Sequence, residues 1–580
     1  MSRRDYSKLE KDDLLKVIRK LESRKKYGLV WDEEKTKEKF EKESENALPV
    51  LKEVRSNEIK TDESKPTNVL IEGDNYHALS VLNYTHQGKI DVIYIDPPYN
   101  TGKKDFKYND NFVEKDDAYR HSKWLSFMSK RLRLAKNLMK DDGLACISID
   151  DNEASQLKLL CNEIFGEDNL LDVFYIQVRY AGKSLNEKDD FQKLIEQVLI
   201  YAKNKHLFTP KKPSTEYNTD TFKFKIIEKE KGQEVTLGKK KVVILKPGQY
   251  EITEEKPNLN LLKGTWASGS VLKGNTSGKF FHNYIENRKS IDGLGVLYKV
   301  YGIGEDGLGY RYFTGPKKET TTKGLFYSGL PLARRAEIES GKGSQKESPI
   351  VNFYDFSGDF GNIRHEGGMD FRSGKKPTRL LKMLINLHKN KDASVLDFFA
   401  GSGSTGHAVL SLNEDDDGDR SFLLCTNNEE NICTDVCYPR LKNVINGYQS
   451  VKALGGNLKY YKTAFVKNSI SRDDLKIRIT RECTEMLCLR EGIFNEVETK
   501  SDYHIFEQNG RIMGVYYSME RDSLSQLKKE LDKMKGEKIL YCFTFDPLGL
   551  DKNDFADWTG VSLEPIPQKI LDIYEQIYEY

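Results

Sequence analysis

Four consecutive residues, Asp96-Pro97-Pro98-Tyr99, follow an apolar run at 90–95 and could do chemistry together. A β-branched apolar run that stops at an acidic residue and two prolines predicts a buried strand that ends in a rigid turn. The prolines remove two backbone N–H donors, so the carbonyl groups of the turn can face a ligand. Asp96 adds another acceptor, and Tyr99 adds a flat ring. This combination suits a planar base that carries an amino group.

A second turn, Gly401-Ser402-Gly403-Ser404-Thr405-Gly406, has GxGxxG spacing and lies between an expected strand and an expected helix. Such turns bring the backbone close to a ligand and present the amides of a helix N-terminus to negative charge. Nicotinamide or flavin dinucleotides are one class of candidate ligand, and other nucleoside cofactors use similar turns. Asn427, Asn428 and Glu429 end the next expected strand, about where a ribose-binding acid belongs.

The two turns are expected to be neighbours. Both follow buried strands, so both should lie at the carboxyl edge of one parallel sheet, where open α/β folds bind ligands. A nucleoside cofactor over the glycine turn would then lie beside an amine held by Asp96 and Tyr99. A dehydrogenase has no use for a site that holds an amine. S-adenosylmethionine would use both turns, because its sulfonium methyl group could be directed at the amine.

The motifs resemble those of amino-methylating DNA methyltransferases of the β arrangement, in which DPPY precedes the target-recognition insertion and FxGxG follows it. DFFAGSGST at 397–405 is similar to the cofactor motif of that family. The resemblance extends over nearly the whole chain to the modification (Mod) subunits of type III restriction–modification systems, through NVLIEGDNYHALSVL, YRHSKWLSFM, ISIDDNE, TNNEENIC and EMLCLREGIF. It is weakest at 206–350, the region that varies with the target sequence in that family.

This resemblance implies an S-adenosylmethionine-dependent enzyme that methylates the 6-amino group of adenine in double-stranded DNA. The base must be flipped out of the duplex, at a cost of roughly a few kcal/mol. Asp96 and the Pro97 carbonyl would hold the amino hydrogens while Tyr99 stacks on the base, and neither a metal ion nor a covalent enzyme intermediate is expected. The 4-amino group of cytosine is the nearest alternative target. A DNA-binding scaffold with an inactive catalytic domain and an NAD-dependent oxidoreductase are alternatives from other classes.

The resemblance also assigns residues to the cofactor. The turn from Phe399 to Gly403 should hold the methionine end, with the two following hydroxyls available to its carboxylate. Asp74 is expected near the adenine ring, Asn428 or Glu429 near the ribose, and Lys376 in the position of a Lys-Pro pair that contacts the cofactor in this family. The residues so assigned are Asp74, Lys376, Asp397, Phe399, Ala400, Gly401, Ser402, Gly403, Ser404, Thr405, Asn428 and Glu429.

The elements that must position these residues alternate between strands and helices, which predicts a mainly parallel α/β sheet of a permuted Rossmann-like kind. The main strands are expected at 67–74, 90–95, 143–151, 173–178 and 197–201, and the main helices at 75–85, 122–140, 152–165 and 377–389. The sequence Asp141-Asp142-Gly143 is expected to stop the second of these helices. The expected domains are an N-terminal helical segment at 1–60, the DPPY half of the catalytic core at 61–205, an inserted target-recognition domain at 206–350, the cofactor-binding half at 351–455 and a C-terminal α+β domain at 456–580. The first segment should contain a helix near Leu14–Leu21, and the insertion should consist of loops and small sheets. The last domain should contain a helix at 473–492 and a hairpin turn at Asn509-Gly510.

Charge is distributed unevenly along the chain. The net charge is +2, yet residues 211–350 hold 25 Lys and Arg against 16 Asp and Glu. Aromatic residues alternate with these basic residues between 298 and 318, which suits phosphate contact and base stacking. A solvated lysine-rich surface is the alternative.

Composition excludes some classes of protein. No apolar run approaches eighteen residues, and no signal peptide is visible at the N-terminus, so a cytoplasmic protein is expected. The resemblance implies a nucleoid-associated protein of a prokaryote or phage. Eight cysteines in so long a chain indicate reduced core residues, and Cys433 and Cys437 are expected on one face of a helix. No GxxxxGK[ST] signature is present, so DNA cleavage would need a separate restriction subunit. A homodimer is expected from the resemblance.

Overall fold

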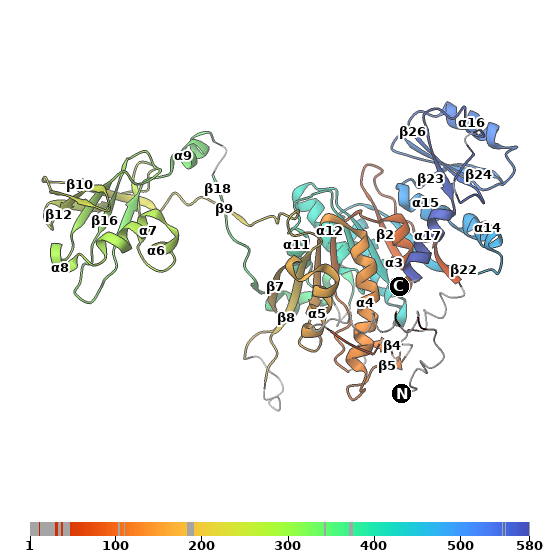
Figure 1. Cartoon of the computed structure of the whole chain (residues 1–580), viewed down its shortest axis with the longest axis horizontal. Helices are drawn as coiled ribbons and strands as arrows, with labels where there is room; N and C mark the ends of the chain where they lie inside the picture. Colours follow the sequence, from red (N-terminus) through yellow and green to blue (C-terminus); the bar gives the residue numbers. More distant parts are fainter. Residues whose placement is uncertain are drawn as a thin grey trace. The chain divides into compact units, whose positions relative to one another are not determined.

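The computed structural model describes residues 11, 15, 29–32, 36, 38, 47–102, 105–108, 111–182, 191–341, 344–370, 375–547, 549–551 and 553–578. The chain folds as two compact units, one formed by 1–211 with 351–580 and the other by 212–350 (Figure 1). Within the described residues, no helix combines the length and apolar character needed to cross a membrane.

A ten-stranded sheet forms the centre of the first unit, with the order β1-β22-β2-β21-β20-β3-β6-β8-β7-β19. Its strands are β1 (Ala47–Glu53), β2 (Thr67–Glu72), β3 (Ile90–Ile95), β6 (Met139–Ile149), β7 (Leu170–Gln177), β8 (Ile195–Ala202), β19 (Phe353–Asp355), β20 (Ser394–Asp397), β21 (Ser421–Thr426) and β22 (Asn457–Lys467). The six strands from β22 to β6 are all parallel, whereas β8 runs antiparallel to both of its neighbours. The predicted α/β class with a mainly parallel sheet is confirmed.

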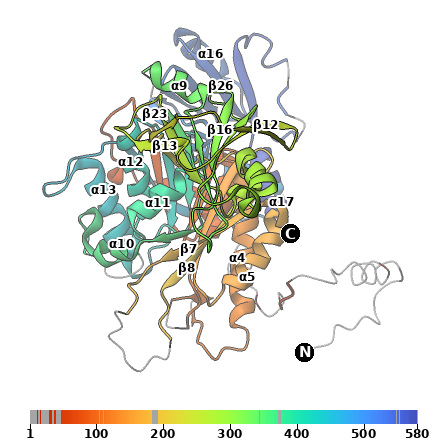
Figure 2. The same ribbon diagram turned by 90° about the vertical axis from the view of Figure 1, so that its left-hand side faces the viewer.

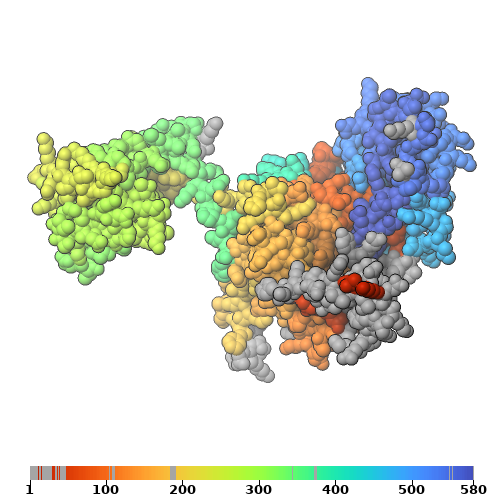
Figure 3. Space-filling view, viewed as in Figure 1, coloured from red at the N-terminus to blue at the C-terminus, as the bar shows by residue number. Residues whose placement is uncertain are grey.

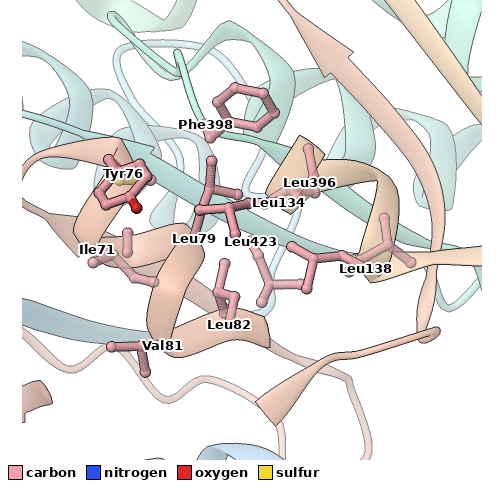
Figure 4. Close-up of a cluster of buried hydrophobic side chains, with 14 of the residues drawn as sticks. Ile71, Tyr76, Leu79, Val81, Leu82, Leu134, Leu138, Leu396, Phe398 and Leu423 are labelled. Carbon is pink, nitrogen blue, oxygen red and sulfur yellow. The ribbon is translucent and has the colours of Figure 1, made fainter. Parts of the chain in front are cut away.

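Helices cover both faces of this sheet. In Figure 2, α4 and α5 lie on one side, and α11, α12 and α13 lie on the other. The helices are α3 (Asn75–Thr85), α4 (Arg120–Leu138), α5 (Ala154–Phe165), α11 (Thr378–Ile385), α12 (Ser404–Asp416) and α13 (Tyr438–Asn446). Figure 4 shows how the first face is packed: Leu82 of α3 and Leu138 of α4 lie with Leu396 and Leu423 of the sheet, and all four are buried. Burial of such side chains stabilises the fold by about 1.5–3 kcal/mol each.

Three sequence-based expectations about elements are wrong. Residues 47–53, expected in a helical segment, form strand β1, because the apolar run there pairs with the end of β22. Helix α4 ends at Leu138, and the Asp141-Asp142-Gly143 sequence lies inside β6 rather than at a helix stop. The helical pattern at 473–492 forms two helices, α14 (Arg472–Glu482) and α15 (Thr484–Glu491), which meet at Cys483. The expected helix near Leu14–Leu21 lies outside the described residues, apart from isolated Leu15.

The C-terminal part of this unit forms a five-stranded sheet with the order β23-β24-β25-β26-β27. The elements are β23 (Asn495–Thr499), β24 (Tyr503–Gln508), β25 (Arg511–Tyr516), α16 (Leu524–Lys533), β26 (Glu537–Phe543), β27 (Val561–Ile566) and α17 (Gln568–Tyr578). Asn509 and Gly510 form the predicted hairpin turn, with φ angles of 51° and 73°. Buried residues of α15 and α17 join the same hydrophobic core as those of α3, and in Figure 3 the blue C-terminal surface borders orange surface of the first half.

The second unit contains one eight-stranded antiparallel sheet rather than the expected loops and small sheets. Its order is β11-β12-β15-β16-β17-β14-β10-β13. The strands are β10 (Phe222–Glu228), β11 (Gln233–Leu237), β12 (Lys240–Leu245), β13 (Tyr250–Glu254), β14 (Leu262–Trp266), β15 (Leu297–Tyr301), β16 (Tyr310–Thr314) and β17 (Leu325–Ser328). Near the start and the end of this unit, β9 (Ser214–Glu216) and β18 (Gln345–Glu347) pair as a short antiparallel sheet. Short strands joined across long loops give little helical or strand periodicity, which explains why the sheet was not foreseen.

Candidate active site

Four neighbouring parallel strands, β2, β21, β20 and β3, end at one edge of the large sheet. β20 and β3 pair directly, with Leu396 opposite Ile93. The glycine turn after β20 and the DPPY turn after β3 are therefore neighbours, as the sequence predicts. Asp74 follows β2 and Asn428 follows β21, so these two predicted residues lie at the same edge of the sheet.

Two acceptors of the DPPY turn have no hydrogen-bond donor among the residues that the structure describes. Oδ1 of Asp96 accepts a 2.9 Å hydrogen bond from the Tyr99 hydroxyl, and the Pro98 carbonyl accepts one of 2.7 Å from the indole N–H of Trp124. Oδ2 of Asp96 and the Pro97 carbonyl accept no hydrogen bond from the described residues. Because the Asp96 side chain is only 21% exposed, an amino group that reached this turn would meet two acceptors in a partly desolvated setting.

Lys376 and Glu196 complete the surroundings of this turn. The Lys376 ammonium lies 2.6 Å from the Tyr99 hydroxyl, 2.7 Å from Oε2 of Glu196 and 3.3 Å from Oδ1 of Asp96. Burial works to lower the pKa of Lys376, but the two carboxylates outweigh it and raise that pKa. Burial raises the pKa of Asp96, and the Lys376 charge opposes this effect. Lys376 thus contacts the DPPY residues, and its predicted contact with the cofactor stays a prediction.

Asn100, directly after the DPPY motif, anchors the end of the turn. Its φ angle is 57°, a left-handed conformation that non-glycine residues adopt rarely. Its side-chain amide donates a 2.5 Å hydrogen bond to Oε1 of Glu153, and Nδ1 of His121 lies 2.6 Å from the same oxygen. Glu153 is fully buried, and burial raises its pKa. Neither Asn100 nor Glu153 was among the predicted site residues.

The glycine turn has the geometry of a ligand cradle. Gly401 and Gly403 have φ angles of 49° and 75°. A Cβ on Gly403 would lie 3.0 Å from Sγ of Cys437, whereas a Cβ on Gly401 would have only the Phe399 carbonyl within 4 Å, at 3.8 Å. Gly403 therefore permits close packing of α12 on the next helical segment, and Gly401 leaves the outer side of the turn open.

Buried polar side chains hold this turn from inside. Asp397 accepts hydrogen bonds from the Phe399 amide at 2.9 Å and from the Thr405 hydroxyl at 2.5 Å. The Arg440 guanidinium, which is fully buried, donates to the hydroxyls of Ser404 at 2.6 Å and Ser402 at 3.3 Å. Arg440 was not predicted, because no motif surrounds it.

The remaining predicted cofactor residues all have partners within the chain. Asp74 caps α3 by accepting from the Tyr76 amide at 2.7 Å. Asn428 accepts from two amides of the following helical turn, at 3.1 Å each. Glu429 forms a 2.9 Å ion pair with Lys107. That helical turn, 432–437, also carries Cys433 and Cys437, both buried, so the expectation that they share one helical face is confirmed. The cofactor contacts of Asp74, Asn428 and Glu429 stay predictions.

Comparison with known proteins identifies the family to which the chain is similar. A family model described as DNA methylase (N6_N4_Mtase) matches residues 90–436. The chain is 30% identical to the type III restriction-modification enzyme EcoPI Mod subunit of Escherichia phage P1, over 80% of this chain and 72% of that protein. It is 32% identical to the StyLTI Mod subunit of Salmonella typhimurium over 62% of this chain, but spans only 52% of that relative. Among solved structures, a PvuII DNA methyltransferase (cytosine-N4-specific) is similar over 66% of this chain and 89% of that chain, with 11% identity and a TM-score of 0.33.

Proposed function

The chain belongs to the DNA methylase family, and we propose that it transfers a methyl group from S-adenosylmethionine to the 6-amino group of a flipped-out adenine in duplex DNA. The observation that carries this proposal is the pair of unpaired acceptors, Oδ2 of Asp96 and the Pro97 carbonyl, beside the glycine turn of the neighbouring strand. A site for a planar amine next to a site for a nucleoside cofactor suits N-methylation.

The residues of the DPPY turn would activate the amine. The lone pair of an exocyclic amino group is delocalised into the ring, which makes the nitrogen a poor nucleophile. Acceptors on both N–H groups favour a tetrahedral nitrogen and direct its lone pair away from the ring. Asp96 would also stabilise the positive charge that develops on nitrogen and can accept the proton that nitrogen then releases. Positioning and electrostatics of this kind can supply most of the acceleration.

The residues at the end of β20 fit the cofactor. S-adenosylmethionine supplies an electrophilic methyl group on sulfonium. The open side of Gly401 would admit its methionine end, and the first amides of α12 would face its carboxylate. Ser404 and Thr405 point their hydroxyls at Arg440 and Asp397, so we assign the carboxylate contact to backbone amides rather than to these hydroxyls.

We assign target recognition to the second unit. Its charge excess supports contact with DNA, and Trp266, which is 61% exposed, offers a ring for stacking. Tyr298, Tyr312 and Phe313, from the stretch expected to stack on bases, are instead buried in the core of this unit. By similarity to Mod subunits, the chain would serve a type III restriction–modification system as a homodimer with a separate restriction subunit. A solitary methyltransferase and a cytosine 4-amino methyltransferase remain the alternatives. The nucleoid-associated, cytoplasmic location expected from the sequence stays a prediction.

Labelled methyl transfer tests the proposal. The protein is incubated with labelled S-adenosylmethionine and DNA from a host that lacks the gene, and the DNA is digested to nucleosides. The expected product is 6-methyladenine, and 4-methylcytosine alone would assign the cytosine alternative. Asp96→Ala is expected to abolish labelling, whereas Asp168→Ala, which removes an exposed carboxylate elsewhere in the same unit, is expected to keep it. Equal labelling by Asp96→Ala and the native protein would refute the proposed site.

A further inference from the structure

We propose that Glu196 is a positioning residue of the methyl-transfer site, which draws the Lys376 ammonium away from Asp96 and so leaves that carboxylate available to the target amine. This inference rests on the proposed function and extends it to a residue outside both sequence motifs. The contact between Glu196 and Lys376 is the shorter of the two ion pairs that Lys376 makes, at 2.7 Å against 3.3 Å for Asp96.

The sheet topology explains why Glu196 reaches the site. Because β8 runs antiparallel to β6, its first residues lie at the edge where the parallel strands end. The adjacent residue Gln197 pairs with Ile149, the last residue of β6. Glu196 thus arrives at the DPPY turn from a strand that begins at the edge where β3 ends. The position is fixed by backbone pairing on both sides of β8, since Glu196 also pairs with Ile176 of β7.

The charges of the cluster do not balance. Among the described residues that contact one another here, Lys376 is the one cation, and it faces the carboxylates of Asp96 and Glu196 and the hydroxyl of Tyr99. Its three N–H groups match these three partners, and its side chain is only 9% exposed. Burial raises the pKa of Tyr99 well above its ordinary value, so this residue stays a neutral phenol. The ammonium must therefore be shared between Glu196 and Asp96.

This sharing decides how strongly Asp96 can accept a hydrogen bond from the amine. If Glu196 lost its charge, Asp96 would be the one charged carboxylate of the described residues still in contact with the ammonium, and Lys376 would move towards it. A cation bound tightly to Asp96 would neutralise the field that activates the amine and would compete for the carboxylate oxygens. Glu196 also competes with Asp96 for the single proton of the Tyr99 hydroxyl, because its Oε2 and Oδ1 of Asp96 each lie 2.9 Å from that hydroxyl.

Glu196→Gln is the test, since it removes the charge and keeps the shape. We expect kcat for methyl transfer to fall by about 10- to 100-fold, as for a displaced catalytic group, while the KM values for DNA and S-adenosylmethionine change less than about threefold. Glu167→Gln is the matched control, because it removes one exposed carboxylate from the same unit and should leave kcat unchanged.

The pH profile separates this role from a merely structural one. Asp96 faces Lys376, Glu196 and Tyr99, and it also interacts with Tyr94 of its own strand and Asp397 of β20. The Glu196 charge raises the pKa of Asp96. Without that charge the pKa of Asp96 falls, so the acid limb of the kcat profile is expected at lower pH in Glu196→Gln than in the native protein. Glu196→Asp keeps the charge and should restore part of kcat.

The outcomes distinguish this inference from the proposed function. If the native protein transfers no methyl group to DNA, the proposed function itself is refuted, independently of Glu196. If the native protein is active and Glu196→Gln matches it in kcat and in the position of the acid limb, the role of Glu196 is refuted. Should Glu196→Gln fail to fold, Glu196→Asp takes its place. A kcat below the native value at unchanged KM supports the role, because the shorter side chain holds the ammonium less closely, and native kcat refutes it.

Discussion

The Thr405 hydroxyl donates a 2.5 Å hydrogen bond to Oδ2 of Asp397 and so joins the end of strand β20 to the first turn of helix α12. The other oxygen of Asp397 accepts from the Phe399 amide, and the glycine turn is thereby closed from inside by one buried carboxylate. Burial raises the pKa of Asp397 to about 7, although both hydrogen bonds oppose this. Such a group makes stability depend on pH.

The native protein should become less stable as pH rises, and Asp397→Asn is expected to be less sensitive to that rise. The unfolded carboxyl releases its proton near pH 3.8, whereas the folded one keeps it until about pH 7. Stability from this group is therefore full below about pH 4 and is lost as pH rises through about 7, by at most about 4 kcal/mol. Asparagine avoids this loss, because its oxygen can accept from Phe399 and its amide can donate to Thr405.

Apparent melting temperatures at pH 5 and pH 8 check this prediction. The native protein should lose more stability between the two values than Asp397→Asn does. Asp419→Asn, which changes an exposed carboxylate beyond the far end of α12, should behave like the native protein. If the melting temperatures of the native protein and of Asp397→Asn changed equally between the two pH values, ionisation of Asp397 would cost little stability.

Gly401→Ala is expected to weaken binding of S-adenosylmethionine by about tenfold or more, because a methyl group would occupy the open side of the turn. The left-handed φ angle adds backbone strain of about 1 kcal/mol. Gly88→Ala is a matched control, since Gly88 also has a positive φ, 64°, with nothing within 4 Å of an added Cβ. Titration calorimetry should find weaker binding in Gly401→Ala alone. Equal affinity in both variants would place the cofactor elsewhere.

Arg440→Lys is expected to weaken cofactor binding by about tenfold, because a lysine cannot donate to Ser402, Ser404 and Glu366 with one planar fork. The glycine turn would then lose its inner support. Arg420→Lys provides the comparison: Arg420 is equally buried and pairs with Asp416 at the other end of α12. Both variants should lower the melting temperature, and only Arg440→Lys should raise the Kd for S-adenosylmethionine. A Kd that rises equally in both would indicate a general effect of packing.

The sequence is sufficient to predict the two turns and their juxtaposition, because each signal is local. An apolar run before a proline pair or a glycine turn marks the end of a strand, and parallel strands end at one edge. Glu196, Glu153 and Arg440 could not be found in this way. Their flanking residues form ordinary strands and helices. Their importance depends on contacts with Tyr99, Asn100 and Ser404, which lie 97, 53 and 36 positions away in sequence, respectively.

The same reasoning explains the errors in the expected elements. Strand β1 has an apolar core of four residues, and such a short run does not distinguish a strand from a helix. Its identity is set by β22, more than 400 residues later. The charged residues of Asp141-Asp142-Gly143 suggest a turn, but pairing of β6 with β3 continues on both sides of them, with a register shift that absorbs the extra residues. Long-range pairing thus overrides local propensity.

Asn100→Gly is expected to lower kcat for methyl transfer by about tenfold while it preserves the fold. Glycine adopts the left-handed conformation of this position at no steric cost, so the change isolates the side-chain contact with Glu153. Without that contact, the residue after Tyr99 is no longer anchored to helix α5, and the DPPY turn can depart from its productive position. Asn509→Gly is the control, because Asn509 also has a left-handed φ, 51°, but lies in an exposed hairpin. Rates of methyl transfer at saturating substrate check the prediction: native kcat in Asn100→Gly would show that the prolines alone hold the turn.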